Sequence, residues 1–261
     1  NFTIYEAPPN GQGIVVFFIL ELLKQFDIKN LSKSDYYHIY VEAVKIAYSL
    51  RDKFLGDPKY QKLDLMNLIQ ENIIKNYANK INLDYASNVE ISDFSDHKDT
   101  IYLTVKDKNG MTISFINSLF DQFGSGITVP QTGILLHCRG KSFSLKYNHP
   151  NQISGRKRPL HTIIPGMIGR NDDVVGSFGV MGGHYQAAGH AFILSQILDF
   201  HLSPQCALDL PRIFPNNGIL DIEENFDSDL IAELKNKGHK INYPALPIGG
   251  GQIIVTDIDT V

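Results

Sequence analysis

Apolar side chains recur at helical spacing through the first part of the chain. Residues 14–26 are apolar at most positions, which is typical of a helix buried on all sides. In residues 35–54 apolar positions recur every three or four residues, and Ser32 or Ser34 is suited to cap that helix. The breaker Gly56-Asp57-Pro58 is expected to end it. The pattern therefore predicts two long helices near the N-terminus.

A third helical pattern precedes a stretch without any period. Leucines, isoleucines and Tyr77 predict a helix over residues 63–77. Residues 88–99 are polar and aperiodic, which predicts an exposed linker. We expect residues 1–99 to be mainly helical and to end in this linker.

From Thr100 onward the pattern is that of β-structure. Apolar residues over 102–106 and 111–118 flank Asp107-Lys108-Asn109-Gly110, and Asn-Gly is a strong hairpin signal. Further strands are predicted over 129–137, 161–167, 174–180 and 252–256, and helices over 184–200, 204–210 and from Ser228 to Gly238. Residues 100–261 are therefore expected to form a β-rich unit with flanking helices.

Composition describes an ordinary globular protein and excludes several classes. Of 261 residues 43% are hydrophobic and 20% are charged, and the formal net charge of −4 gives no basic excess for nucleic acid. Cys138 and Cys206 form no CxxC or zinc-finger spacing, so neither a disulfide framework nor a metal site is indicated. The longest apolar run, 14–23, is too short for a bilayer, which needs about 20 residues. We expect a soluble protein, without any indication of its location.

The start of the predicted hairpin carries the most informative residue, Thr100. If the Asp99–Thr100 bond is cut, Thr100 owns both a hydroxyl nucleophile and a free amine that can act as its base. Because β-branched residues commonly begin strands, a purely structural role for Thr100 stays open.

A glycine pair, Gly182-Gly183, follows the strand predicted at 174–180. Two successive N–H groups without side chains can point at a developing oxyanion, although an ordinary turn has the same composition. The turn Gly124-Ser125-Gly126 lacks the GxSxG spacing of a nucleophile elbow, so Ser125 is a poor candidate nucleophile.

These motifs, in their order and spacing, resemble the gamma-glutamyltransferase family of N-terminal-nucleophile hydrolases. The other segments that carry the resemblance are Glu6-Ala7-Pro8-Pro9-Asn10-Gly11-Gln12-Gly13, Val41-Glu42-Ala43, Arg51-Asp52, Gly56-Asp57-Pro58, residues 130–136, Arg158-Pro159, residues 207–212 and Gly249-Gly250-Gly251-Gln252. Because the chain begins at Asn1 almost directly on a motif, it is expected to be the later part of a longer protein.

The resemblance implies an α/β fold, the four-layer αββα sandwich of these hydrolases, present here incompletely. Residues 1–99 would be the C-terminal part of the large subunit, and residues 100–261 the small catalytic subunit. The expected partner is the missing N-terminal part of the large subunit, in a heterodimer made by self-cleavage at Asp99–Thr100. No metal or organic cofactor is implied.

The resemblance also implies a set of site residues. Catalysis would fall to Thr100, Ser118, Gly182 and Gly183, with Ser118 bonded to the amine of the nucleophile; a strand serine satisfied by backbone is the alternative. Substrate contacts would come from Phe120, Arg139, Ser142, His161, Thr162 and His184. His184 is equally compatible with a helix-start histidine.

Several of these positions depart from the family pattern. Phe120 stands where members have Asn, Lys141-Ser142 where they have an acidic pair, and His161-Thr162 where they have Ser-Ser. Together with Arg139-Gly140 they resemble a divergent branch of transferases and acylases. Recognition of a free γ-glutamyl head group, whose amine the acidic pair binds, is therefore less well supported than acylation.

One feature is independent of the resemblance. From Gln122 to Asn171 there is no Asp or Glu, while seven positions are basic: Arg139, Lys141, Lys146, Arg156, Lys157, Arg158 and Arg170. Such a stretch suits a substrate rich in carboxylates, although a solvated basic loop has the same composition.

The favoured function is hydrolysis or transfer of γ-glutamyl groups from glutathione-like amides. An amide acylase acting on another, dicarboxylic acyl group is an alternative. A second alternative is a catalytically inactive homologue with a binding role.

Overall fold

The computed structural model describes residues 2–61, 63–89, 91 and 99–256, which include six α-helices and nine strands. The helices are α1 (Gly13–Leu23), α2 (Lys33–Phe54), α3 (Glu71–Ala78), α4 (Gln186–Leu198), α5 (Pro204–Asp209) and α6 (Ser228–Asn236). The strands are β1 (Thr3–Tyr5), β2 (Asp99–Lys106), β3 (Thr112–Phe120), β4 (Gly166–Arg170), β5 (Asp173–Met181), β6 (Ile213–Asn216), β7 (Ile219–Ile222), β8 (Ile241–Asn242) and β9 (Gly250–Val255). Short 3-10 turns are η1 (Ile28–Asn30), η2 (Pro58–Tyr60), η3 (Leu65–Ile69), η4 (Arg139–Ser142) and η5 (Gly183–Tyr185).

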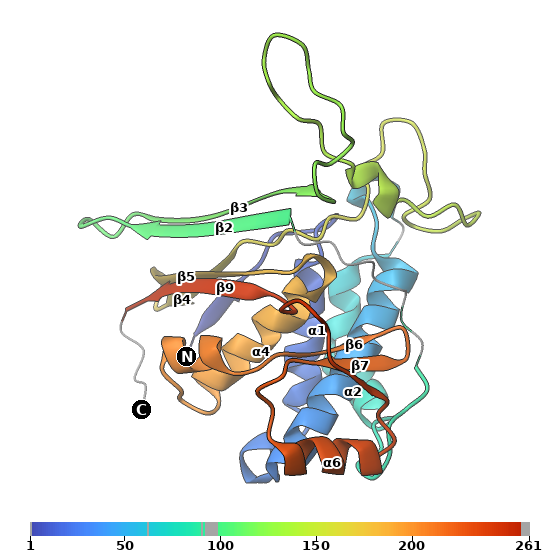
Figure 1. Cartoon of the computed structure of the whole chain (residues 1–261), viewed down its shortest axis with the longest axis vertical. Helices are drawn as coiled ribbons and strands as arrows, with labels where there is room; N and C mark the ends of the chain where they lie inside the picture. Colours follow the sequence, from blue (N-terminus) through green and yellow to red (C-terminus); the bar gives the residue numbers. More distant parts are fainter. Residues whose placement is uncertain (1, 62, 90, 92–98, 257–261) are drawn as a thin grey trace.

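These elements form three layers. Helices α1, α2 and α4 cover one face of a sheet of order β1-β4-β5-β9, and the antiparallel hairpin β2–β3 covers the other face (Figure 1). A small sheet of order β6-β7-β8 lies beside α2 together with α6. This arrangement is part of the predicted αββα sandwich: one helical layer and two β layers.

The helical layer forms because its helices have few polar faces. Both α1 and α4 are buried along most of their length, as the continuous apolar pattern of 14–26 predicts for the first. The long α2 begins at the Ser32 cap, whose Oγ accepts a hydrogen bond from the Asp35 amide at 3.1 Å. No described helix is long and apolar enough to cross a membrane.

A buried histidine joins this layer to the sheet. His190 of α4 accepts a hydrogen bond at Nε2 from the Val180 amide of β5 (3.0 Å) and contacts Glu6 Oε1 through Nδ1 (2.7 Å). Since Nε2 is an acceptor, the ring proton lies on Nδ1 and is donated to Glu6. Burial raises the pKa of Glu6, and the facing imidazole opposes that rise. The contact fixes β5 immediately before its glycine turn.

The hairpin lies on the sheet through small residues. Tyr102 of β2 packs on Gly179 of β5, where a Cβ atom would lie 2.3 Å from the ring. The hydroxyl groups of Thr104 and Ser177 are in contact beside this position. Alternate side chains on the far face of the hairpin are exposed: Ile101, Leu103, Val105, Ile113 and Phe115.

Two predicted elements are wrong in part. Residues 129–137, predicted as a strand, form a turn flanked by one isolated bridge, Thr128–Leu135, because Pro130 has no N–H and Gln131 and Gly133 adopt φ values of 67° and 70°. Residues 63–77, predicted as one helix, are divided at Gln70, whose ψ of 141° is extended, into η3 and α3.

Other boundaries differ less. The strand predicted over 161–167 begins at Gly166, since His161 makes only a single bridge, to Gly11. Asp227, one residue before the predicted helix start at Ser228, caps α6 through its side chain. The sequence pattern did not predict the short strands β1, β6, β7 and β8. Most of the linker predicted over 88–99 lies outside the described residues.

Gly179→Ala is expected to destabilise the protein by about 1–3 kcal/mol, because the added methyl group displaces Tyr102 from a packed position. Chemical denaturation measures the change. Gly155→Ala is the matched control, since its Cβ would meet no atom within 4 Å. Equal stabilities of the two variants would contradict this account of the layer packing.

Candidate active site

The hairpin brings the two candidate hydroxyl groups together. Thr100 lies opposite Ser118 in the β2–β3 register, and Thr100 Oγ1 donates a hydrogen bond to Ser118 Oγ at 3.2 Å. Ser118 Oγ also accepts from the amide of Phe120 at 3.0 Å. The register shifts between Asp99 and Thr100, the two residues of the proposed cleavage bond, and Phe120 opposite Asp99 has a φ of 81°. The backbone is therefore irregular on both strands at this end.

The glycine pair forms the junction between β5 and η5, which continues into α4. Gly182 has a φ of 128° and Gly183 one of 59°, conformations that favour glycine. A Cβ on Gly182 would lie 2.6 Å from the Ile248 carbonyl oxygen. Amide groups at the start of a helix point outward along its axis, so this junction can stabilise negative charge.

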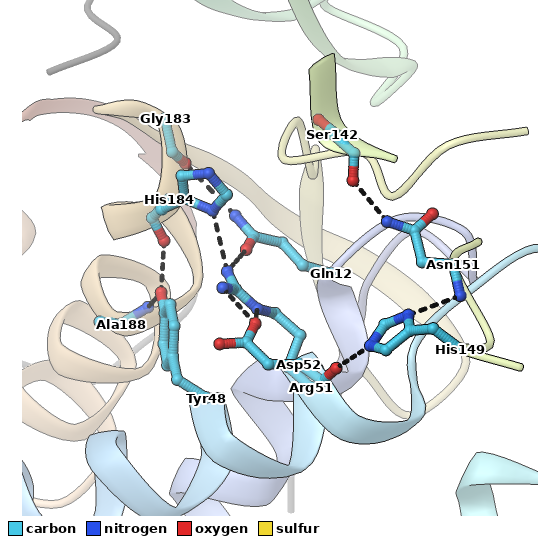
Figure 2. A network of polar contacts seen from close by, with 10 residues as sticks. All are labelled: Gln12, Tyr48, Arg51, Asp52, Ser142, His149, Asn151, Gly183, His184 and Ala188. Atoms are coloured by element: carbon cyan, nitrogen blue, oxygen red, sulfur yellow. Dashed lines mark hydrogen bonds and ion pairs between the residues drawn. The ribbon is translucent and has the colours of Figure 1, made fainter. Parts of the chain in front are cut away.

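A buried glutamine holds this junction in place. Gln12 Nε2 donates to the carbonyl oxygen of Gly183 at 3.3 Å, and Gln12 Oε1 accepts from Arg51 Nη1 at 3.0 Å (Figure 2). Gln12 Nε2 also donates to the carbonyl oxygen of Thr162 at 2.9 Å. The side chain is completely buried. Gln12 therefore connects the Pro-Pro-Asn-Gly segment, α2 and the glycine turn.

His184 belongs to the same network. Its Nδ1 lies 3.0 Å from Arg51 Nη1, and its carbonyl oxygen accepts a hydrogen bond from the Tyr48 hydroxyl group (Figure 2). Tyr48 in turn accepts from the Ala188 amide at 3.3 Å. His184, predicted to contact substrate, therefore makes contacts with α2 from its position in η5, directly before α4.

A second branch leads from the end of α2 to η4. His149 Nε2 donates to the Asp52 carbonyl oxygen at 2.7 Å, and His149 Nδ1 accepts from the Asn151 amide at 3.0 Å (Figure 2). The Asn151 side chain donates to the carbonyl oxygen of Ser142. Arg51, which contacts Gln12, is ion-paired with Asp52 at 2.6 Å. The glycine turn and η4 are therefore fixed to one helix end.

Phe120 lies at the centre of the predicted residues. Its ring contacts the Arg139 guanidinium, whose Cζ is 4.2 Å from the ring centroid. The same ring meets His184 edge to face, with 6.2 Å between centroids. Phe120 is buried, and its ring packs against Arg139 of η4 and His184 after the glycine pair. A contact of Phe120 with substrate stays a prediction.

Arg139 is a buried cation with one strong partner. It is 2% exposed, and its Nη1 donates to Thr162 Oγ1 at 2.7 Å. Burial lowers the pKa of Arg139 to about 10, so the guanidinium stays charged at neutral pH. The six other basic residues of 122–171 lie mostly on exposed or half-buried loops.

His161 is neutral beside this charge. Burial, with Arg139 and His137 nearby, lowers the pKa of His161 to about 4. Its Nδ1 accepts from the Ile163 amide at 3.3 Å, which places the ring proton on Nε2. The His161 backbone is tied to the N-terminal segment, donating to the Asn10 carbonyl oxygen and accepting from the Gln12 amide.

One group of side chains has the composition of a metal site. His38, Glu42 and His239 are buried with potential ligand atoms within 4.8 Å of one another. Their hydrogen bonds are already used: His38 Nδ1 lies 2.8 Å from His239 Nε2, and the Glu42 carboxylate binds the Lys45 ammonium (2.7 Å) and the Ser87 amide (3.1 Å). This cluster is a self-satisfied polar network.

Comparison with known proteins decides the family. The family model described as Gamma-glutamyltranspeptidase matches residues 1–261. The chain belongs to the gamma-glutamyltranspeptidase family.

Relatives of this family member include proteins named as different amide-cleaving proenzymes. It is 34% identical over 249 residues to the Glutathione hydrolase-like YwrD proenzyme of Bacillus subtilis, covering 92% of this chain and 47% of the relative. It is 30% identical over 249 residues to the Oxamate amidohydrolase proenzyme of Klebsiella pneumoniae, covering 93% of this chain and 47% of the relative. The chain spans about half the length of the curated relatives it matches.

Solved structures agree. The cephalosporin acylase from Bacillus halodurans superposes with a TM-score of 0.88 at 35% identity, over 98% of this chain and 47% of that one. The gamma-glutamyltranspeptidase from Pseudomonas nitroreducens has the same fold over 60% of this chain and 89% of its own, with a TM-score of 0.56 at 24% identity. The predicted N-terminal-nucleophile hydrolase fold, present incompletely, is confirmed.

The sequence did not single out the residues that support the site. Gln12 and Arg51 stand inside segments that carry the family resemblance, but a motif does not show which backbone groups a side chain holds. Tyr48, His149 and Asn151 gave no signal. The predicted residues Thr100, Ser118, Phe120, Arg139 and Thr162 are joined by contacts, and Gln12 connects them to Gly183.

Gln12→Leu is expected to lower the free energy of unfolding by about 2–4 kcal/mol, because two carbonyl oxygens and a guanidinium lose a buried partner. Denaturant titration measures it. Gln205→Leu, at an exposed position of α5, should change stability by less than about 0.5 kcal/mol. A tolerated Gln12→Leu would show that the glycine turn does not depend on this amide.

A lower pH should reduce the stability of the folded protein through the buried residues His38 and His239. Burial lowers the pKa of His239 to about 3 and also lowers that of His38, whereas an unfolded histidine has a pKa of about 6.5. Below about pH 6.5 the unfolded chain therefore binds protons that the folded chain does not, and stability is lost as pH falls.

Each such histidine contributes at most about 1.4 kcal/mol per pH unit. Denaturation between about pH 6 and pH 4 should show a shallower pH dependence in His239→Gln than in the wild type. The exposed control His201→Gln should keep the wild-type dependence. Identical slopes in all three proteins would exclude His239 as the source.

Proposed function

We propose that this chain carries the catalytic centre of an amide hydrolase whose nucleophile is Thr100, released by cleavage of the Asp99–Thr100 bond. The observation that carries the proposal is the pairing of the Thr100 and Ser118 hydroxyl groups at 3.2 Å, at the end of a hairpin where the backbone is irregular. Family membership supports it, since relatives are named as proenzymes.

Cleavage would proceed by an acyl shift. Thr100 Oγ1 attacks the Asp99 carbonyl carbon, the peptide C–N bond breaks, and an ester replaces it while the nitrogen becomes the Thr100 amine. Water then hydrolyses the ester, releasing the Asp99 carboxylate and restoring the hydroxyl group. Ser118 Oγ, already bonded to Thr100, is placed to hold the new amine with its lone pair toward the hydroxyl proton.

The mature site would then acylate and deacylate. Thr100 Oγ1 attacks the substrate carbonyl, its amine takes the hydroxyl proton, and that proton passes to the leaving amine as the substrate C–N bond breaks. The Gly182 and Gly183 amides are suited to stabilise the oxyanion, each such donor being worth about 3 kcal/mol. Water, or an amine in transfer, releases the acyl group.

Residues 1–99 and 100–261 would be parts of the large and small subunits, and the remaining large-subunit residues would be their partner. The acyl group is first proposed as γ-glutamyl, because several relatives are named as glutathione hydrolases. An acylase function has its own support: the match to a cephalosporin acylase and the presence of Ser142 rather than an acid on η4.

Thr100→Ala should leave the chain uncut and reduce amide turnover by at least about 10⁴-fold, because both the nucleophile and its base are lost. Mass spectrometry detects the fragments, and release of p-nitroaniline from γ-glutamyl-p-nitroanilide and other acyl p-nitroanilides measures turnover. Thr112→Ala, on the partner strand of the hairpin, is the matched control and should be cut and active.

Undiminished turnover in Thr100→Ala would end the proposal. A wild-type chain that stays intact after long incubation would favour an inactive homologue instead.

A further inference from the structure

The buried pair Glu6–His190 takes no direct part in the proposed chemistry, although it lies next to the glycine turn. The side chains of His190 and Glu6 are 0% and 1% exposed, and His190 Nδ1 lies 2.7 Å from Glu6 Oε1. His190 Nε2 accepts a hydrogen bond from the Val180 amide at 3.0 Å. Burying an ionisable pair is costly and is compensated only by good hydrogen bonds, which here include this one to the backbone of β5.

These two contacts leave the imidazole ring of His190 one possible state. Nε2 accepts, so it carries no proton, and a ring that also accepted at Nδ1 would be an anion. The ring is therefore neutral, with its proton on Nδ1 and donated to Glu6. The carboxyl group of Glu6 selects this tautomer, as a buried carboxylate does for the histidine of a catalytic triad. The tautomer leaves a lone pair on Nε2 for the backbone of β5.

This lone pair holds β5 beyond the end of its neighbouring strand. The register of β4 with β5 ends at Gly166 opposite Phe178, two residues before Val180. Pro165, which has no N–H group, precedes Gly166 and suits the end of a ladder. The last part of β5 is therefore held by its pairing with β9, which continues to Met181, and by His190 of α4.

The same hydrogen bond joins the strand before the glycine turn to the helix after it. Val180 and His190 are ten residues apart, and the segment between them contains the glycine pair and η5. The two elements are in close contact here, since a Cβ on Gly189 would lie 2.7 Å from Val180 Cγ1. The turn is thus closed at its two ends by His190, while Gln12 holds a carbonyl oxygen inside it.

The pair also lies near the strand that carries the proposed nucleophile. Tyr102 of β2 packs on Gly179, the residue before Val180. Burial raises the pKa of Tyr102, and the nearby Glu6 carboxyl group adds to the rise. Thr100 and Tyr102 are two residues apart in β2 and therefore lie on the same face of the hairpin. The layer that contains Glu6 and His190 thus supports both the turn and the nucleophile strand.

We propose that His190, set in its Nδ1–H tautomer by Glu6, is a positioning residue for the oxyanion donors of the glycine turn. The proposal rests on the proposed function, in which the Gly182 and Gly183 amides stabilise the oxyanion. The hydrogen bond to Val180 fixes where the chain enters the turn, and a shift of that entry would turn the amides away from the oxyanion. Because the oxyanion forms in the transition state, loss of this contact should lower kcat far more than it raises KM.

The test compares His190→Gln with His190→Asn on the complete, processed protein. Glutamine can place its Oε1 near the position of His190 Nε2 and accept from the Val180 amide, whereas asparagine is one carbon shorter and cannot reach it. We expect kcat of His190→Asn to fall by about 100-fold, the effect of a small displacement of catalytic groups, with KM within about threefold. His190→Gln should stay within about tenfold of the wild-type kcat.

The substrate is γ-glutamyl-p-nitroanilide, or the acyl p-nitroanilide that the wild type cleaves fastest, and kcat is expressed per processed chain counted on a denaturing gel. His201→Gln, at an exposed position, is the control and should match the wild type. A histidine that only stabilises the fold would lower the yield of both His190 variants and leave kcat per processed chain unchanged. Equal kcat values for the two variants, or a loss confined to KM, would overturn the proposal.

A measurement on the wild type makes the test independent of whether the variants fold. Nitrogen NMR of ¹⁵N-labelled protein distinguishes the two neutral tautomers and the imidazolium. We expect a scalar coupling across the hydrogen bond from the Val180 amide to Nε2 of a neutral ring that carries its proton on Nδ1. An Nε2–H tautomer or an imidazolium at His190, at neutral pH, would overturn the proposal.

The two proposals fail separately. Turnover that requires Thr100 but is the same in His190→Gln and His190→Asn excludes the positioning role alone. Turnover that survives Thr100→Ala excludes the proposed function, and the NMR measurement then still decides whether Glu6 sets the tautomer of His190.

Discussion

One buried amide, that of Gln12, fixes the geometry on which the candidate site depends. It holds the carbonyl groups of Gly183 and Thr162 at once, and Arg51 holds its oxygen. In a trans peptide the carbonyl oxygen of one residue lies opposite the N–H group of the next. The direction of the His184 amide, directly after the glycine pair, is therefore set by a residue about 170 positions earlier in the chain.

Burial has a larger effect than neighbouring charges on the protonation of the titratable side chains near this site. It leaves His161 neutral beside Arg139 and raises the pKa of Glu6 beside His190. The guanidinium of Arg139 remains charged because even its lowered pKa, about 10, is far above neutrality. The interior thus contains a positive charge that packs on the ring of Phe120, the residue opposite Asp99 in the hairpin register.

The sequence predicted those parts that local chemistry specifies. The Asn-Gly turn and apolar pattern predicted the hairpin, and the family resemblance named Ser118, which the hairpin register puts opposite Thr100. The turn at 129–137 was missed because apolar residues in a protruding loop have the same pattern as a strand. That Arg139 points inward, while the basic residues around it lie mostly outside, depends on Phe120 and Thr162, which are distant in sequence. No local pattern contains that information.

The packing of α1 and α2 against α4, β6 and α6 also bears on what happens after backbone scission. Residues before and after position 100 contribute to one hydrophobic core, which includes Val16, Tyr40, Phe192 and Leu234. Two polypeptides produced by a cut at that position would share this core, and neither would have a separate one. They would stay joined as one folding unit, and neither could be exchanged for a fresh copy without unfolding the other.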